Sequence, residues 1–168
     1  MTFPIAAVGI FFAIALVYDV RHRIIPNRLT VAMALSGVLY HLLPGPGGHG
    51  LFFTVTGALT GGCLLIVPFL LGGMGGGDVK LMAGGGAWLG AEATVHLFAF
   101  GAFAGALIAL AMMAVRQTAG DWRGVYHDSL SFLLTGKRTV TVSRGQTFPY
   151  SIALVAGLVA YAVFGRVF

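Results

Sequence analysis

The chain has 168 residues, of which 58% are hydrophobic and only 9% are charged. An ordinary soluble domain carries about 25% charged residues, so this composition excludes a typical soluble enzyme and indicates a membrane protein. The formal net charge is +5, and because the basic residues gather in two loops between apolar runs, we expect membrane lipids, and not nucleic acid, as their partner.

Six apolar runs have the composition of membrane-spanning helices. A hydrocarbon core of about 30 Å requires about 20 apolar residues in a helix. Backbone groups in lipid must be hydrogen-bonded within their own segment, so helices are the default. None of the runs contains Asp, Glu, Lys or Arg, and they cover residues 3–18, 29–43, 51–71, 81–91, 94–115 and 148–164. The sequence predicts an all-α membrane protein, a polytopic bundle of about six transmembrane helices in a single domain over residues 1–168.

Charge in the loops predicts the orientation of these helices. The first loop carries three arginines, and the long loop of residues 116–147 carries five basic residues against two acidic ones. The positive-inside rule places both loops in the cytoplasm. This arrangement requires the short run 81–91 to cross the membrane, and a re-entrant run is the alternative that the sequence leaves open. We therefore expect a multi-pass membrane protein whose two basic loops face the cytoplasm.

Two further patterns concern packing. Small residues recur four apart at Gly57 and Gly61, at Gly86 and Gly90, and at Gly101 and Gly105. Such pairs let helix backbones approach closely in lipid. In the long loop, the stretch "DWRGVYHDSLSFLL" (residues 121–134) places apolar residues on one helical face. It fits an amphipathic interfacial helix and a segment packed over the bundle equally well.

Two carboxylates stand directly against apolar runs on the predicted cytoplasmic side. Asp19 follows the first run, and Asp78 precedes the fourth within "GGMGGGDVKLMAGGG" (residues 72–86). Two carboxyl groups in a poorly solvated site cannot easily both ionise, so one keeps its proton. The ionised member can take a proton from water while the protonated member polarises a carbonyl. This pairing is suited to peptide-bond hydrolysis without a covalent intermediate.

The residues around these carboxylates have both functional and purely structural interpretations. Gly75 and Gly77 allow φ angles closed to other residues and leave no side chain between backbone and substrate. Alternatively they form a flexible turn, with Asp78 capping the next helix. Lys80 either orients a carboxylate or the substrate, or anchors the helix at the headgroups. Asn27 is expected to be the N-cap of the second run.

Three stretches together resemble the type IV prepilin peptidase family, in order and over nearly the whole chain. "GGGDVKLMAGGGAWLG" resembles its GxGD signature, "DVRHRIIPNRLT" its first aspartate motif, and "FPYSIALVAG" the segment that opens its last span. The resemblance implies an aspartyl endopeptidase in which Asp19 and Asp78 are the catalytic pair and Gly75 and Gly77 shape the site. It implies cleavage of prepilin leader peptides at the cytoplasmic face of the membrane.

The number of cysteines bears on the branch of this family. Larger members carry a cytoplasmic domain with paired cysteines and also N-methylate the new amino terminus. This sequence has one cysteine, Cys63, and is similar to the short, peptidase-only branch serving tight-adherence (Flp-type) pili. We therefore expect peptidase activity without N-methyltransferase activity, and a prepilin or pseudopilin substrate with a basic leader and an apolar helix. Presenilin-like proteases share GxGD, but no Pro-Ala-Leu motif follows here.

A metal site, a cofactor and two other functions fit the sequence less well than a peptidase. The five histidines are scattered without metal-ligand spacing, so we expect no metal site and no cofactor. A small membrane transporter usually buries ionisable groups within its spans, whereas the six runs hold none. A non-catalytic membrane scaffold would tolerate Asp19→Asn and Asp78→Asn singly. The sequence leaves open whether the two carboxylates meet without substrate.

Overall fold

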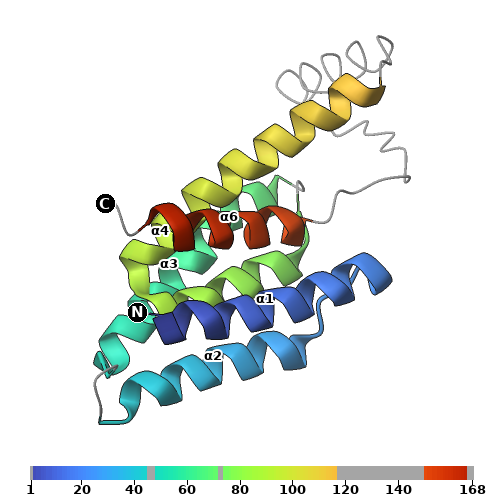
Figure 1. Cartoon of the computed structure of the whole chain (residues 1–168). Helices are drawn as coiled ribbons and strands as arrows, with labels where there is room; N and C mark the ends of the chain where they lie inside the picture. The colour runs from blue at the N-terminus through green and yellow to red at the C-terminus, as the bar shows by residue number, and fades with distance from the viewer. Residues whose placement is uncertain (1, 45–47, 72–73, 117–149, 166–168) are drawn as a thin grey trace. The chain divides into compact units, whose positions relative to one another are not determined.

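The computed structural model describes residues 2–44, 48–71, 74–116 and 150–165. Every element in these ranges is a helix: α1 (Thr2–His22), α2 (Asn27–Leu42), α3 (Gly50–Leu70), α4 (Gly76–Arg116) and α6 (Tyr150–Phe164) (Figure 1). The all-helical prediction is confirmed for this part of the chain. Three helices contain segments long and apolar enough to cross a membrane: Phe3–His22, Gly50–Leu70 and Gly76–Ile108. The count of six spans stays a prediction.

The structure divides into two compact units. The first contains the residues up to Gly105 together with α6, and it holds the core and the site described below. The second begins at Ala106, and its described part is the remainder of α4. The amphipathic segment considered at residues 121–134 lies outside the described residues. The single domain over residues 1–168 stays a prediction.

Helix α4 consists of two helical stretches joined at Gly90. This residue has φ 79° and ψ 173°, a conformation that is open to glycine and strained for other residues. The break lies near the end of the apolar run 81–91, two residues before Glu92, which follows that run. The first stretch begins at Gly76, so at 1.5 Å per residue it is about 21 Å long. That length is less than the ~30 Å hydrocarbon core, and complete crossing by this stretch stays a prediction.

Glycines bring α3 and α4 into backbone contact. A Cβ atom on Gly57 would overlap the carbonyl of Gly86, and one on Gly86 would overlap the carbonyl of Gly57. One turn further along α3, a Cβ on Gly61 would overlap the carbonyl of Met82. The close approach predicted from the small-residue pairs is confirmed here. Because no side chain separates the two helices, the position of α3 directly determines where the first stretch of α4 lies.

The core of the first unit is apolar and draws on every helix. Helix α1 packs against α6 and α2, and α2 packs against α3. The largest fully buried apolar side chains are Phe12, Met33, Leu65, Leu81, Met82, Leu97 and Leu154. Many other large apolar side chains face outward, and Phe52, for example, is 83% exposed. Exposed apolar surface on this scale fits a protein surrounded by lipid and does not fit a soluble monomer.

Candidate active site

Asp19 lies in the last turn of α1. The helix continues to His22 instead of ending with the apolar run at residue 18. Arg23 then takes a left-handed conformation with φ 53°, and its N–H donates to the carbonyl of Asp19 at 2.8 Å. This closure is a common way to end a helix. A helix therefore holds the backbone of Asp19, whose side chain is half-buried.

Asp78 lies in the first turn of α4, which begins at Gly76, before the predicted run. Its N–H donates to the carbonyl of Gly75 at 3.2 Å. The residue is 7% exposed, and among the described residues its Oδ1 atom has no hydrogen-bond partner. Leaving a buried polar atom unsatisfied costs about 1–3 kcal/mol. Such an atom in a native structure calls for an explanation, of which a catalytic role is one.

The two carboxyl groups are near each other. The Asp19 carboxylate is close enough to act electrostatically on Asp78. The sequence left open how close they lie, and here they are within electrostatic reach of each other. They come from α1 and α4 and are 59 positions apart in the chain.

The first two residues of α6 lie beside the carboxylates, one near each. Neither was predicted from the sequence. The hydroxyl of Ser151 donates to Oδ2 of Asp19 at 2.5 Å, and Ser151 is fully buried. Tyr150 lies within electrostatic reach of Asp78. In the sequence, both residues belong to the stretch "FPYSIALVAG", which resembles the opening of the family's last span. Neither residue type suggests a partner until the fold places α6 beside α1.

The glycines before Asp78 leave space, and the expectation that they supply unusual φ angles was wrong. Neither Gly75 nor Gly77 has a positive φ, and Gly77 lies within the helix that begins at Gly76. A Cβ on Gly77 would lie 3.0 Å from the Cβ of Ile25, which is buried. A Cβ on Gly75 would lie 3.6 Å from Oδ2 of Asp78. The small residues therefore let Ile25, from the loop after α1, pack directly on the start of α4.

Lys80 joins the start of α4 to the start of α2. Its Nζ donates to Oδ1 of Asn27 at 2.9 Å, and among the described contacts it makes no ion pair with either carboxylate. The prediction that Asn27 is an N-cap was wrong. Pro26 holds the N-cap position with φ −63° and ψ 132° and no side-chain capping bond. The amide oxygen of Asn27 accepts from a charged donor instead, which makes a stronger hydrogen bond than a neutral N–H.

These contacts gather the site at one end of the bundle. The end of α1 and the starts of α2, α4 and α6 all meet there. The first unit's described cations, Arg21, Arg23, Arg28 and Lys80, belong to the same end. Within the described residues, no group of three or more His, Cys, Asp or Glu side chains is arranged to hold a metal ion.

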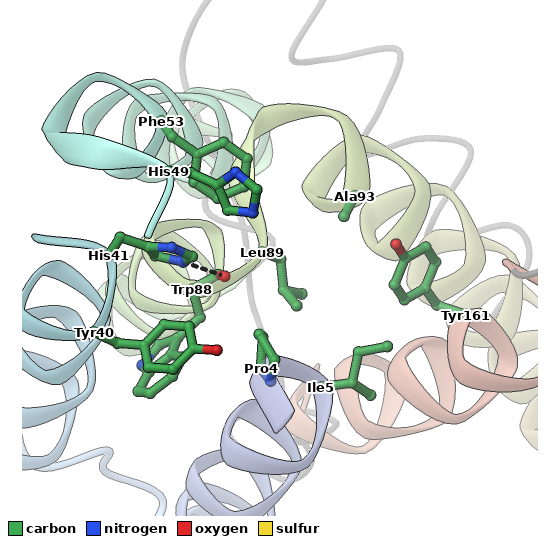
Figure 2. Close-up of a pocket in the computed structure, with 10 residues that line it drawn as sticks. All are labelled: Pro4, Ile5, Tyr40, His41, His49, Phe53, Trp88, Leu89, Ala93 and Tyr161. Atoms are coloured by element: carbon green, nitrogen blue, oxygen red, sulfur yellow. Dashed lines mark hydrogen bonds between the residues drawn. The ribbon is translucent and has the colours of Figure 1, made fainter. Parts of the chain in front are cut away.

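A cavity of about 110 Å³ lies at the opposite end of the first unit (Figure 2). It is lined by Pro4, Ile5, Tyr40, His41, His49, Phe53, Trp88, Leu89, Ala93 and Tyr161. Trp88 anchors this end, because its Nε1 donates to the carbonyl of Met33 at 2.9 Å and its own carbonyl accepts from His41 Nε2 at 2.9 Å. No carboxylate lines the cavity, so we take the Asp19–Asp78 pair as the candidate active site.

Comparison with known proteins identifies relatives of this chain. Residues 6–110 match the type IV leader peptidase family, and this range includes both aspartates. The chain is 32% identical over 104 residues to the prepilin leader peptidase/N-methyltransferase of Aeromonas salmonicida (strain A449). It is also 32% identical over 106 residues to the protein of that name from Aeromonas hydrophila. Each alignment covers 59% of this chain but only 36% of the relative. No solved structure matches the chain.

The family match covers well over half of the sequence, and it includes the ends of α1 and α4 that carry the paired carboxylates. The chain belongs to the type IV leader peptidase family.

Proposed function

We propose that this protein is an aspartyl endopeptidase that removes the leader peptide of type IV prepilins at the cytoplasmic face of the inner membrane. The observation that carries this proposal is the pair of carboxylates at one end of a bundle of apolar helices. Asp78 is 7% exposed and Asp19 is close enough to interact with it electrostatically. An unpartnered, buried oxygen on Asp78 is available to a substrate.

The proposed reaction divides the work between the two carboxyl groups. One is ionised and accepts a proton from a water molecule, whose oxygen attacks the scissile carbonyl carbon. The other is protonated and donates its proton to the carbonyl oxygen, which gives a tetrahedral gem-diol. The first carboxyl then gives its proton to the leaving nitrogen as the C–N bond breaks. A gem-diol hydroxyl returns a proton to the second carboxyl, so both groups are restored.

The position of the site supports a substrate with an apolar helix and a basic leader. The carboxylates lie at the ends of helices that are long and apolar enough to cross a membrane. An apolar substrate helix lying in the bilayer would therefore bring a basic leader to the cytoplasmic rim. The scissile bond must be extended, because a helix hydrogen-bonds its own carbonyls. The exposed Gly75 beside the Asp78 carboxylate leaves room for such a strand.

We also propose the peptidase-only, Flp-type assignment. It is supported by the single cysteine of the 168 residues, since the methylating members pair cysteines in a cytoplasmic domain. No cofactor is needed for the hydrolysis. The intact mass of a processed pilin would show a free amino terminus and would lack the added methyl group.

Co-expression with small prepilins of the same genome tests the proposal. We expect a leader-sized mobility shift with the wild-type chain. Asp19→Asn and Asp78→Asn should each reduce cleavage by roughly 10²–10⁴-fold at normal membrane levels, because each removes a proton-transfer group. Glu92→Gln is the matched control, since Glu92 is an exposed carboxylate within electrostatic reach of Tyr161, which lines the cavity at the other end of the first unit. Full cleavage by either Asp→Asn variant refutes the paired mechanism and favours a non-catalytic scaffold.

A further inference from the structure

The hydroxyl of Ser151 makes a contact unlike those of six other Ser and Thr hydroxyls in the described helices. Those of Thr30, Ser36, Thr54, Thr56, Thr60 and Thr94 all donate to carbonyls of their own helix. Ser151 instead donates to the Asp19 side chain of α1, 132 positions away. Bonds to the same helix are the usual arrangement for Ser and Thr in helix interiors. The packing of α6 on α1 therefore brings this hydroxyl to a carboxylate.

Burial leaves the Ser151 hydroxyl without water as a competing hydrogen-bond partner. Ser151 is 0% exposed, so its hydroxyl has no bulk water as an alternative partner. A serine hydroxyl has one proton to donate, and here that proton is on the line to Oδ2 of Asp19. The terminal torsion of an aspartate is broad and roughly two-fold. A hydrogen bond from a fixed neighbour therefore restricts that torsion and fixes the direction in which the other oxygen of Asp19 points.

The two carboxylates are supported unequally. Asp19 is half-buried and receives the Ser151 hydroxyl. Asp78 is more deeply buried, and its Oδ1 has no hydrogen-bond partner among the described residues. Burial in the first turn of α4 restrains Asp78, whereas the more open Asp19 needs another restraint. Catalytic groups must be held close to the productive geometry, and such support usually comes from a neighbouring hydrogen bond.

We propose that Ser151 is a positioning residue that holds the Asp19 carboxylate in the orientation from which it works with Asp78. This inference rests on the proposed peptidase function. Ser151 has no role in bond making and acts only through Asp19. It also gives α6, the last of the described helices, a part in a site whose two carboxylates come from α1 and α4.

The test compares purified full-length variants for kcat and KM on a prepilin that the wild type cleaves. We expect Ser151→Ala to lower kcat about tenfold to hundredfold and to leave KM within about twofold, because substrate binding is intact while Asp19 is less well oriented. Ser151→Thr keeps the hydroxyl and should recover most of the lost kcat; if it does not accumulate, Ser151→Cys replaces it. Ser36→Ala is the matched control, because it removes a helix hydroxyl that bonds only to Met33.

Each outcome decides the matter. Wild-type cleavage together with an unchanged kcat in Ser151→Ala overturns the positioning role and leaves the peptidase function standing. The positioning role is also overturned if neither Ser151→Thr nor Ser151→Cys restores the kcat lost in Ser151→Ala. It is likewise overturned if Ser36→Ala loses as much kcat. In both cases Ser151 has a purely structural role. A wild-type chain that cleaves no prepilin, with both Asp→Asn variants indistinguishable from it, overturns the proposed function and this inference with it.

Discussion

Adjacent glycines on α3 offer a matched test of how the site is held in place. A Cβ on Gly61 would overlap the Met82 carbonyl and lie 2.9 Å from its carbonyl carbon, whereas a Cβ on Gly62 would meet only the Ala83 Cβ at 3.9 Å. Gly61→Ala therefore forces two backbones apart, and Gly62→Ala makes an ordinary contact. Both changes carry the same gain in helix propensity, so that gain cancels in the comparison. The difference isolates the cost of overpacking, about 1–3 kcal/mol.

The same displacement should reach the carboxylates. Met82 lies one helical turn after Asp78, on the same face of α4. If α3 pushes the carbonyl of Met82 outward, Asp78 moves with it relative to Asp19. A shift of about 1 Å in a catalytic group can reduce the rate roughly 10²-fold. We expect Gly61→Ala to lose both stability and cleavage, and Gly62→Ala to retain both.

The assays are unfolding in mixed detergent micelles and cleavage of a prepilin by the same preparations. A difference of 2 kcal/mol corresponds to roughly a 30-fold change in the ratio of folded to unfolded protein, which is well within the reach of such a titration. Equal stability of the two alanine variants would refute the backbone contact between α3 and α4. Lower stability of Gly61→Ala with full cleavage would show that the position of Asp78 does not depend on that contact.

Three other outcomes are expected. Lys80→Met and Asn27→Ala should each lower the free energy of unfolding by no more than about 1 kcal/mol. The two losses should not add in the double variant, because both changes remove the same exposed hydrogen bond. Additive losses in an unfolding titration would contradict this. Trp88→Phe should destabilise the fold by about 1 kcal/mol, because it removes the hydrogen bond from the indole to the α2 backbone. Its kcat on prepilin should be unchanged. A lower kcat would show that the cavity end of the unit affects the active site. Gly77→Ala should lower kcat several-fold by pushing against Ile25 at 3.0 Å. Gly62→Ala, whose new Cβ meets only the Ala83 Cβ at 3.9 Å, is the spatial control, and wild-type activity in Gly77→Ala would argue against a site-shaping role.

Hydropathy and charge, read along the chain, were sufficient for the general class of the protein. Lipid demands contiguous apolar segments with internally bonded backbones, so the helical class is a local property of the sequence. The positions of Asp19 and Asp78 beside apolar runs are equally local. The small-residue pairs also predicted close approach of helix backbones, because close approach in lipid requires small side chains. That α3 and α4 are the partners was decided by the tertiary structure.

Contacts between distant residues were decided by tertiary packing. The hydroxyl of Ser151 needs α6 beside α1 before Asp19 becomes its partner, and Asn27 accepts from Lys80 only because the starts of α2 and α4 meet. The absence of a side chain at Gly77, directly before Asp78, leaves space for Ile25, and Gly77 does not adopt an unusual φ angle. Hydrogen bonds and van der Waals contacts of this kind are satisfied over a few ångströms in space, whereas sequence patterns report only neighbours along the chain.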